Sequence, residues 1–369
     1  MKILFVIDSL GSGGGQKQCV ELANNLVSSF DITIFLYNQK SDFFLKKINS
    51  KIKIHKVKNR VKKGFSFKVL KDLKIYMDKS DIVISFMLAA NIYVAITSLI
   101  SSKAKRICVE RSISHISEDK LLRFLANLAC RRSHLTICNT YSQANYIRNH
   151  FGMTKKVLTI WNGIAEHNCA SRTFNNKEKL IFVVIARVAY PKNGLRLLQA
   201  LNIFYERNKF IPSIIWAGRD DMSSKLSLLM KQQMISFLND HPHISAKFNF
   251  VGEQKKINSL YSSADALILP SIYEGLPNVM CEAMINRCPV IMSKVADNKK
   301  ILGINEKRGF LCDPFSTLDI CLAMERRINI SKHALKEMTN NARVFAINYF
   351  SISKMVNEYK KVIKNIKKH

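Results

Sequence analysis

The sequence predicts an α/β fold built from two doubly wound parallel sheets, and three observations lead to this prediction. The chain has 369 residues, more than one hydrophobic core usually organises. Short apolar runs alternate with amphipathic segments along both halves, as strands and helices do in parallel α/β proteins. Between the halves, residues 166–178 carry no periodic pattern, which is typical of a linker.

The first half contains the pattern of a complete sheet. Strands are expected at 2–7, 32–37, 52–57, 82–86, 106–110, 135–139 and 157–161. Helices are expected at 16–27, 66–78, 119–131 and 141–150. The charge-free stretch 82–100 approaches membrane-spanning length, but its polar serine, asparagine and threonine side chains favour a strand followed by a buried helix.

The second half repeats the alternation. Strands are expected at 180–186, 213–217, 247–251, 266–269 and 290–293, and helices at 194–206, 223–238, 255–262, 316–328, 331–347 and 351–367. We expect a first domain over 1–165, a linker over 166–178, a second domain over 179–345, and a C-terminal helix over 346–369 that packs back toward the first domain. The ligand site of such a chain would be the cleft between the domains.

The net charge of +31 indicates either an anionic partner or a lysine-rich composition spread over the whole surface. An anionic membrane, nucleic acid and a phosphorylated substrate are the candidate partners. Within residues 60–79, phenylalanine and leucine mix with six lysines. This segment predicts either a helix at a membrane surface or an ordinary amphipathic helix docked on the first sheet.

The cysteine pattern favours a reduced, cytoplasmic setting. The nine cysteines are scattered, odd in number and never arranged as Cys-x-x-Cys. The first residues become polar too quickly for a signal peptide, so we expect them to form the first strand and do not expect secretion.

The stretch 269–285 joins an apolar strand to a helix and carries two glutamates eight positions apart, Glu274 and Glu282. Ligands bind beyond the carboxyl ends of strands in open α/β sheets, so both carboxylates are expected around one elongated ligand. Gly275 lets the backbone approach that ligand closely, and Pro277 suits the first turn of the helix.

Two cations follow the first strand of the second half. Arg187 and Lys192 can converge on a diphosphate, the arginine as a bidentate fork and the lysine as a point charge. The alternative is a pair of solvated surface cations. The glycines that follow the first strand of the chain also have two interpretations, backbone amides facing a phosphate or sugar at a helix start, or a turn that needs positive φ angles.

Together these motifs resemble those of the retaining glycosyltransferases of the GT-B fold, glycosyltransferase family 4, over nearly the whole chain. Glu274 and Glu282 match the family's E-x7-E motif, and Arg187 and Lys192 match its R-x4-K pair. The resemblance implies two Rossmann-like domains that face an interdomain cleft, with C-terminal helices closing the chain.

The resemblance also implies roles for these residues. Arg187 and Lys192 would bind the donor diphosphate, Glu282 would hydrogen-bond the nucleotide ribose, and Glu274 would contact the transferred sugar. We favour a front-face route, in which the leaving phosphate helps deprotonate the acceptor, over a route with Glu274 as nucleophile. No cofactor and no metal ion are expected, because protein cations already meet the diphosphate.

By the same resemblance, the N-terminal glycine loop, the glycine after the second strand of the second half, and the start of the motif helix would contact the donor. The expected donor-binding residues beside Glu282 are Gly13, Gly14, Gly15, Gly218, Gly275, Leu276, Pro277 and Asn278.

Five residues outside these motifs carry separate expectations. His115 could hydrogen-bond the donor sugar or assist an acceptor hydroxyl, and Arg111 in the same loop could meet an acceptor phosphate or form a surface ion pair. Arg287 stands where the family usually has a glycine after the motif helix, which predicts an altered helix cap. His241 and His243 lack an acidic third ligand, so we expect surface side chains there and assign no metal.

The expected activity is transfer of a hexose from a nucleotide sugar, usually linked to UDP in this family, to a glycan or lipid-linked acceptor in surface polysaccharide biosynthesis. The enzyme would work in the cytoplasm, with a peripheral contact to an anionic membrane and none to nucleic acid. The alternatives are a non-catalytic protein that binds polyanions or membrane surfaces, and a GT-B nucleotide-sugar epimerase, which would form product without an acceptor.

Overall fold

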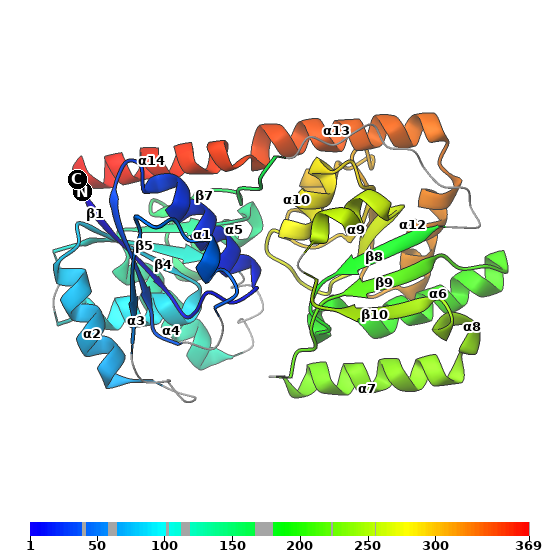
Figure 1. The fold of residues 1–369 in the computed structure, drawn as a ribbon, viewed down its shortest axis with the longest axis horizontal. Coiled ribbons are helices and arrows are strands. Elements are labelled where there is room, and N and C mark those ends of the chain that lie inside the picture. Colours follow the sequence, from blue (N-terminus) through cyan, green and yellow to red (C-terminus); the bar gives the residue numbers. More distant parts are fainter. Residues whose placement is uncertain are drawn as a thin grey trace. The chain divides into compact units, whose positions relative to one another are not determined.

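The computed structural model describes residues 1–38, 42–57, 65–100, 103–111, 119–166, 180–222, 224–254 and 256–368. The chain divides into two compact units (Figure 1). Unit 1 comprises Met1–Ile164 and Phe350–His369, and unit 2 comprises Ala165–Tyr349. Residues 167–179, most of the expected linker, lie outside the described part of the chain.

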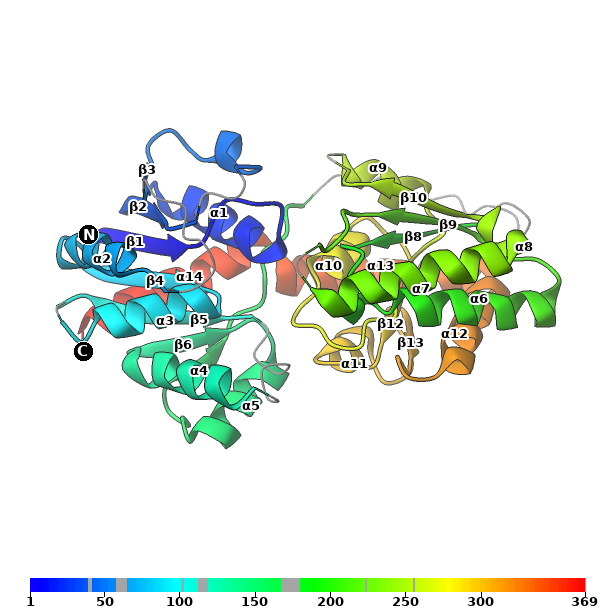
Figure 2. The ribbon, with the colours of Figure 1, turned by 90° about the horizontal axis from the view of Figure 1, so that it is seen from below.

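The described residues of unit 1 form a seven-stranded parallel sheet in the order β3-β2-β1-β4-β5-β6-β7, which Figure 2 shows from β3 to β6. Its strands are β1 (Lys2–Ile7), β2 (Asp31–Leu36), β3 (Lys53–Lys56), β4 (Ile82–Phe86), β5 (Lys105–Glu110), β6 (Leu135–Cys138) and β7 (Val157–Thr159). The strand order reverses between β1 and β4, so ligand-binding loops are expected at the carboxyl ends of these two strands.

Helices cover both faces of the unit 1 sheet, as the alternation of buried strand residues requires. They are α1 (Gly14–Leu26), the 3-10 turn η1 (Leu45–Lys47), α2 (Phe67–Asp78), α3 (Leu88–Thr97), α4 (Lys120–Arg132), α5 (Tyr141–Phe151) and α14 (Ile352–Lys368). Ile3 and Phe5 pack on one face with α1 and α14, while Leu4 and Val6 pack on the other with α2 and α3. Figure 1 shows α14 on one side of these strands and α3 on the other.

Unit 2 repeats this architecture with a six-stranded sheet of described residues in the order β10-β9-β8-β11-β12-β13. Its strands are β8 (Ile181–Ile185), β9 (Ser213–Ala217), β10 (Phe248–Gly252), β11 (Ala266–Leu269), β12 (Val290–Ser293) and β13 (Phe310–Cys312). All pairs are parallel, and the order reverses between β8 and β11. The predicted fold class, two doubly wound α/β sheets, is therefore confirmed.

The helices of unit 2 follow the predicted positions to within a few residues. They are the 3-10 turn η4 (Tyr190–Lys192), α6 (Gly194–Asn208), α7 (Lys225–Asp240), α8 (Pro242–Ser245), α9 (Ile257–Ser263), α10 (Asn278–Ile285), α11 (Asn298–Leu302), α12 (Thr317–Asn329) and α13 (Lys332–Phe350). The sequence reasoning missed α8, α11 and β13. Each is at most five residues long, too short for a periodic signal.

The basic segment 60–79 contains a helix docked on the sheet. Leu70 and Leu73 of α2 are buried in the unit 1 core, which takes them away from a membrane-facing surface. Phe65 stacks on Tyr93 with ring centroids 4.8 Å apart, whereas Phe67 is exposed. The stretch 82–100 contains β4 and α3 as expected, and none of the described helices combines the length and apolar character that a membrane crossing requires.

The turn after α10 corrects the expected altered cap. Arg287 takes a φ of +51°, the left-handed conformation that a glycine would adopt. The Cys288 N–H donates to the Ala283 carbonyl at 2.9 Å and the Arg287 N–H to the Met284 carbonyl at 3.2 Å. This is the Schellman pattern of an ordinary C-cap, so the cap is retained with an arginine in it. The Arg287 Nε donates to Asn340 Oδ1 of α13 at 3.1 Å, which holds the strained residue in place.

Two substitutions separate the strain of Arg287 from its hydrogen bond. Arg287→Gly and Arg287→Ala both lose the bond to Asn340, but only glycine relieves the left-handed backbone. We expect the glycine variant to be more stable than the alanine variant by about 1 kcal/mol. Urea unfolding of unit 2 can be followed through Trp216 in a Trp161→Phe background, since these are the two tryptophans of the chain. Equal stability of the two variants would contradict the strain.

Candidate active site

The site in unit 2 lies at the carboxyl ends of β8 and β11, the adjacent strands at which the sheet order reverses. The loop after β8 carries Arg187 and Lys192, and the loop after β11 carries Glu274. The two loops are joined through their backbones, because the Ile272 N–H donates to the Pro191 carbonyl at 2.9 Å. Sequence motifs about eighty positions apart therefore meet in one place.

Asn193 fixes the geometry of these loops, a role that the sequence reasoning missed. It is 4% exposed and has a φ of +61°. Its Nδ2 donates to the Pro270 carbonyl at 2.9 Å and to the Pro314 carbonyl at 2.7 Å, which ties the β8 loop to the β11 and β13 loops. The Asn193-Gly194 dipeptide is typical of a turn, but nothing in the local sequence identifies the distant carbonyl acceptors.

Glu274 is held through one carboxylate oxygen. Lys192 Nζ forms an ion pair with Oε1, and the buried Ser271 hydroxyl donates to the same oxygen at 2.7 Å. The Lys192 and Glu274 side chains are only 20% and 11% exposed, so this pair is better shielded from water than a surface salt bridge. Among the described residues, Oε2 of Glu274 has no hydrogen-bond donor. That oxygen is available to a ligand hydroxyl.

Arg187 lies two residues beyond the end of β8 and is more exposed than Lys192. Its Nη1 is 3.4 Å from Asp221 Oδ2, and its side chain is 53% exposed. Tyr273 lies near both sides of the site: burial raises the pKa of its phenol, the Glu274 carboxylate raises it further, and the Arg187 cation lowers it. The sequence reasoning did not select Tyr273. Its phenol is close enough to both Arg187 and Glu274 to respond to their charges.

Gly218 follows β9 and is required by packing. A Cβ at this position would lie 1.8 Å from the Ala186 carbonyl oxygen and 3.1 Å from the Arg187 backbone nitrogen. The missing side chain therefore lets the start of the β8 loop lie against the β9 loop. Its expected contact with a donor stays a prediction.

The loop before α10 provides a helix start beside Glu274. Pro277 is the residue before the helix and not its first residue, a one-position shift from the expectation. Leu276 is buried beneath the loop, and Asn278 begins the helix. Among the described residues, the backbone N–H groups of Gly275 and Val279 have no acceptor. Such amides favour an anion or a hydroxyl oxygen at this end of α10.

Glu282 lies inside α10 and is 7% exposed. Its Oε2 accepts a hydrogen bond from the Tyr261 hydroxyl at 2.8 Å. Burial raises the pKa of Tyr261, and the Glu282 carboxylate raises it further, so the phenol stays a donor. Glu282 thus already has one structural partner, and its expected bond to a ribose stays a prediction.

The glycine loop of unit 1 lies at the other point where a sheet order reverses. Gly13 is the N-cap of α1, and Gly14 and Gly15 are its first residues. A Cβ on Gly15 would lie 2.8 Å from the Met87 sulfur, so this glycine is required by close packing next to β4. Met87 itself has a φ of +72°, an uncommon conformation that clusters at functional sites. The fourth proposed catalytic residue, His115, lies outside the described residues.

The described residues contain no group of three or more His, Cys, Asp or Glu side chains that could hold a metal ion. His241 stacks on Phe237, and His243 packs on Tyr205. These contacts give both histidines a structural role in unit 2.

Removing the Asn193 side chain should weaken the connection of the β8 loop to the β11 and β13 loops, while the charged side chains of the site stay unchanged. Asn193→Gly keeps the left-handed turn but leaves two carbonyl groups without their donor, which should cost about 2 kcal/mol of unit 2 stability. Asn202→Ala is a matched control, because it removes a partly exposed asparagine whose Nδ2 donates to Glu206 Oε1 on the same helix. Trp216 fluorescence during urea unfolding measures both, and equal losses would contradict the proposed anchor.

Two family models match this chain. The model described as Glycosyltransferase Family 4 matches residues 12–167, and the model described as Glycosyl transferases group 1 matches residues 170–345. The first covers most of the unit 1 sheet and the second covers the unit 2 sheet, including Arg187, Lys192, Glu274 and Glu282.

Curated relatives match the whole chain or about half of it. A Campylobacter jejuni protein named GalNAc-alpha-(1->4)-GalNAc-alpha-(1->3)-diNAcBac-PP-undecaprenol alpha-1,4-N-acetyl-D-galactosaminyltransferase is 26% identical over 100% of this chain and 99% of its own. An Escherichia coli protein named UDP-Gal:alpha-D-GlcNAc-diphosphoundecaprenol alpha-1,3-galactosyltransferase is 24% identical over 50% of this chain and 45% of its own.

Solved structures share the fold. Anabaena HepE in complex with UDP-glucose has a TM-score of 0.81 at 17% identity and covers 99% of this chain and 100% of its own. Sucrose-phosphate synthase from Thermosynechococcus elongatus has a TM-score of 0.83 at 13% identity and covers 99% and 98%. The two matched models, the full-length relative and the two doubly wound sheets together establish that the chain belongs to the GT-B glycosyltransferases of the family 4 type.

Proposed function

We propose that this glycosyltransferase transfers a hexose, with retention of configuration, from a uridine-diphosphate donor to a glycan or lipid-linked acceptor in surface polysaccharide biosynthesis. The observation that carries the proposal is the cluster of Lys192, Glu274 and Ser271 where β8 and β11 end. In this cluster, a cation that can bind a phosphate is in direct contact with a carboxylate that can bind a sugar hydroxyl.

The relatives support the choice of substrates. The names of the Campylobacter jejuni and Escherichia coli relatives both specify an undecaprenol-linked diphosphate acceptor, and the second also specifies a UDP-linked donor. The Anabaena neighbour was solved with UDP-glucose. A lipid-linked diphosphate acceptor would also give the net charge of +31 an anionic partner.

Lys192 and Arg187 are proposed to bind the donor diphosphate. Lys192 uses only part of its three-donor ammonium group for Glu274, so its remaining N–H donors can meet a diphosphate while the ion pair stays in place. Arg187 is exposed enough to offer its planar fork to the same group. Both cations would then offset the charge that develops on the departing diphosphate.

Glu274 is proposed to position the sugar. Its Oε1 is occupied by Lys192 and Ser271, and its Oε2 can accept a hydrogen bond from a sugar hydroxyl. A carboxylate held in this way is a fixed acceptor, which favours the front-face route over direct attack by Glu274 on the sugar. The unpartnered amides of Gly275 and Val279 and the buried Glu282 are proposed to meet the nucleotide part of the donor.

We place the enzyme in the cytoplasm, with a peripheral contact to an anionic membrane. The described cysteines are free and buried, as expected where thiols stay reduced. Exposed apolar side chains at Phe67, Leu121 and Phe124 of unit 1 would suit a membrane surface.

A panel of uridine, guanosine and adenosine diphosphate sugars tests the donor proposal by thermal shift. We expect the uridine compounds to raise the melting temperature, since a ligand that binds only the folded state stabilises it. Arg187→Ala should lower kcat by about a hundredfold while leaving the melting temperature of the free protein nearly unchanged. Lys225→Ala, which removes an exposed cation of the same unit, is the control and should keep full activity.

Two results would contradict the proposal. One is a panel in which no nucleotide sugar shifts the melting temperature. The other is product formation in the absence of any acceptor, which would indicate an epimerase.

A further inference from the structure

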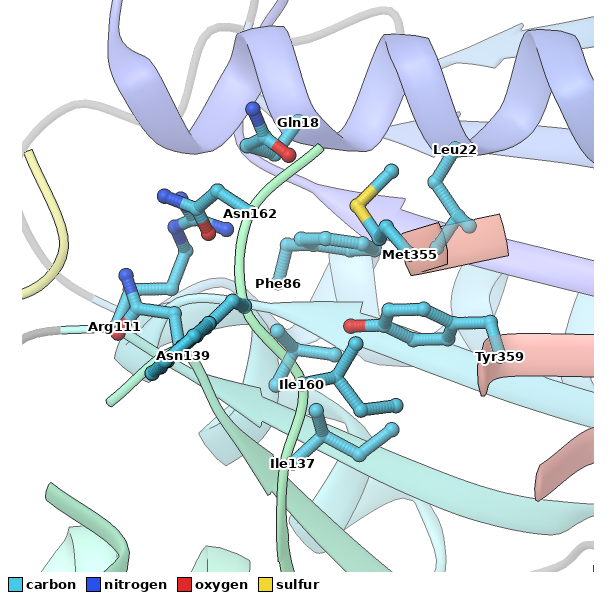
Figure 3. Close-up of a pocket in the computed structure, with 12 residues that line it drawn as sticks. Gln18, Leu22, Phe86, Arg111, Ile137, Asn139, Ile160, Asn162, Met355 and Tyr359 are labelled. Atoms are coloured by element: carbon cyan, nitrogen blue, oxygen red, sulfur yellow. The ribbon is translucent and has the colours of Figure 1, made fainter. Parts of the chain in front are cut away.

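A small cavity lies at the carboxyl end of the unit 1 sheet, and all of its lining residues belong to unit 1. Its volume is about 10 Å³, room for roughly one water molecule or one oxygen of an anion. Figure 3 shows two kinds of lining. Polar ends of Arg111, Asn139 and Asn162 gather on one side, and the rings of Phe86 and Tyr359 lie on the other.

Arg111 follows β5 directly and brings a cation to this cavity. Among the described residues, no hydrogen bond or ion pair engages its guanidinium. Glu110 forms no ion pair with it: the Glu110 Oε1 accepts from the Asn91 amide at 2.6 Å, and burial raises the pKa of this carboxyl to about 7, so it is only partly ionised at neutral pH. The alternative interpretation of Arg111, a surface ion pair, is therefore not formed by the described residues.

Among the described residues, the two titratable groups that act on Arg111 most directly, Tyr359 and Cys19, supply no counter-charge. Burial raises the pKa of both Tyr359 and Cys19 well above neutrality, so both side chains are uncharged there. Burial also lowers the pKa of Arg111 to about 10, so its guanidinium is still a cation at neutral pH. A partly buried cation without a partner destabilises the folded state. An anionic ligand at this position would therefore be stabilised by the charge that it pairs with.

Asn139 provides a second unsatisfied group on the same cavity. It follows β6, is 4% exposed, and its Oδ1 is buried without a hydrogen-bond partner among the described residues. A half-turn of the amide exchanges its oxygen and nitrogen, so the side chain can present an N–H to an oxyanion. Gln18 behaves differently, since it both donates to and accepts from the Gly163 backbone and so belongs to the frame of the cavity.

The start of α1 adds to the positive potential around Arg111. A Cβ on Gly15 would lie 3.7 Å from the Arg111 Cδ, so the first turn of this helix runs next to the arginine side chain. Helix N-termini carry a partial positive charge, and the first turn of α1 contains no acidic residue of its own, while the Asp8 carboxylate beside it accepts the Gln16 amide at 3.0 Å. The cavity therefore combines a cation, an unsatisfied amide and a helix start, three features that favour a negative ligand.

We propose that Arg111 and Asn139 form an oxyanion subsite in unit 1 that holds a phosphate group of the acceptor. The assignment of the phosphate to the acceptor rests on the glycosyltransferase function proposed above. A guanidinium fork can meet two phosphate oxygens at once, and the amide can meet a third. The small volume fits part of one phosphate group and excludes a sugar ring.

Binding of inorganic diphosphate tests the subsite without any transfer reaction. The background is Arg187→Ala with Lys192→Ala, which removes the proposed diphosphate cations of unit 2. Calorimetric titration should show that adding Arg111→Ala raises the Kd by about tenfold or more, and that Arg111→Lys raises it less because the charge stays. Arg123→Ala, at an exposed arginine on α4, is the matched control and should leave the Kd within about twofold.

Kinetics with two acceptors distinguish an acceptor phosphate from a free anion. The probes carry the same sugar on a prenyl diphosphate or on a neutral alkyl chain. Arg111→Ala should raise KM for the diphosphate acceptor by about tenfold and leave KM for the neutral acceptor unchanged. Loss of diphosphate binding with no change in either KM would overturn the assignment to the acceptor.

A purely structural role for Arg111 predicts a different result for melting temperature and diphosphate affinity. Because the described residues make no bond to its guanidinium, Arg111→Ala should not lower the melting temperature. A lower melting temperature with unchanged diphosphate affinity would overturn the subsite. If no donor supports transfer, the proposed function fails, and the diphosphate titration still decides whether the subsite exists.

Discussion

The ion pair between Lys192 and Glu274 is the interaction on which the unit 2 site depends. It joins loops that follow two neighbouring strands but are 82 positions apart in the chain. Asn193 and the backbone bond between Pro191 and Ile272 hold those loops, and Ser271 fixes the carboxylate. A site held by so many cross-loop bonds is arranged before a ligand arrives, which is the condition under which fixed charges stabilise a transition state best.

Unit 1 has the same strand order but a different electrostatic arrangement. In unit 2 the cation at the strand ends has a carboxylate partner, whereas among the described residues of unit 1 Arg111 has none. The difference suits two ligands that bind in different ways. In the proposed function, a donor diphosphate would bind beside a cation that is already paired, while an acceptor anion would supply a counter-charge that the described residues of unit 1 lack.

Much of the fold follows from the sequence because strands buried on both faces leave short apolar runs, such as those of β1 and β11. The motif residues Arg187, Lys192 and Glu274 were also found from spacing and resemblance. Local patterns could not show contacts between distant residues, such as the bond from Asn193 to Pro314, 121 positions away. They also misjudged the Arg287 turn, where a bond to Asn340 in another helix accompanies a conformation usually left to glycine.

Hydrogen–deuterium exchange of the whole protein, with and without saturating UDP, tests most directly whether the β8 and β11 loops form the donor site. We predict slower exchange in peptides that cover residues 186–194 and 270–281, because the nucleotide diphosphate would bind their amides and cations. Arg187→Ala should reduce that protection. Unchanged exchange in both peptides at saturating UDP, with protection elsewhere in the chain, would contradict the account.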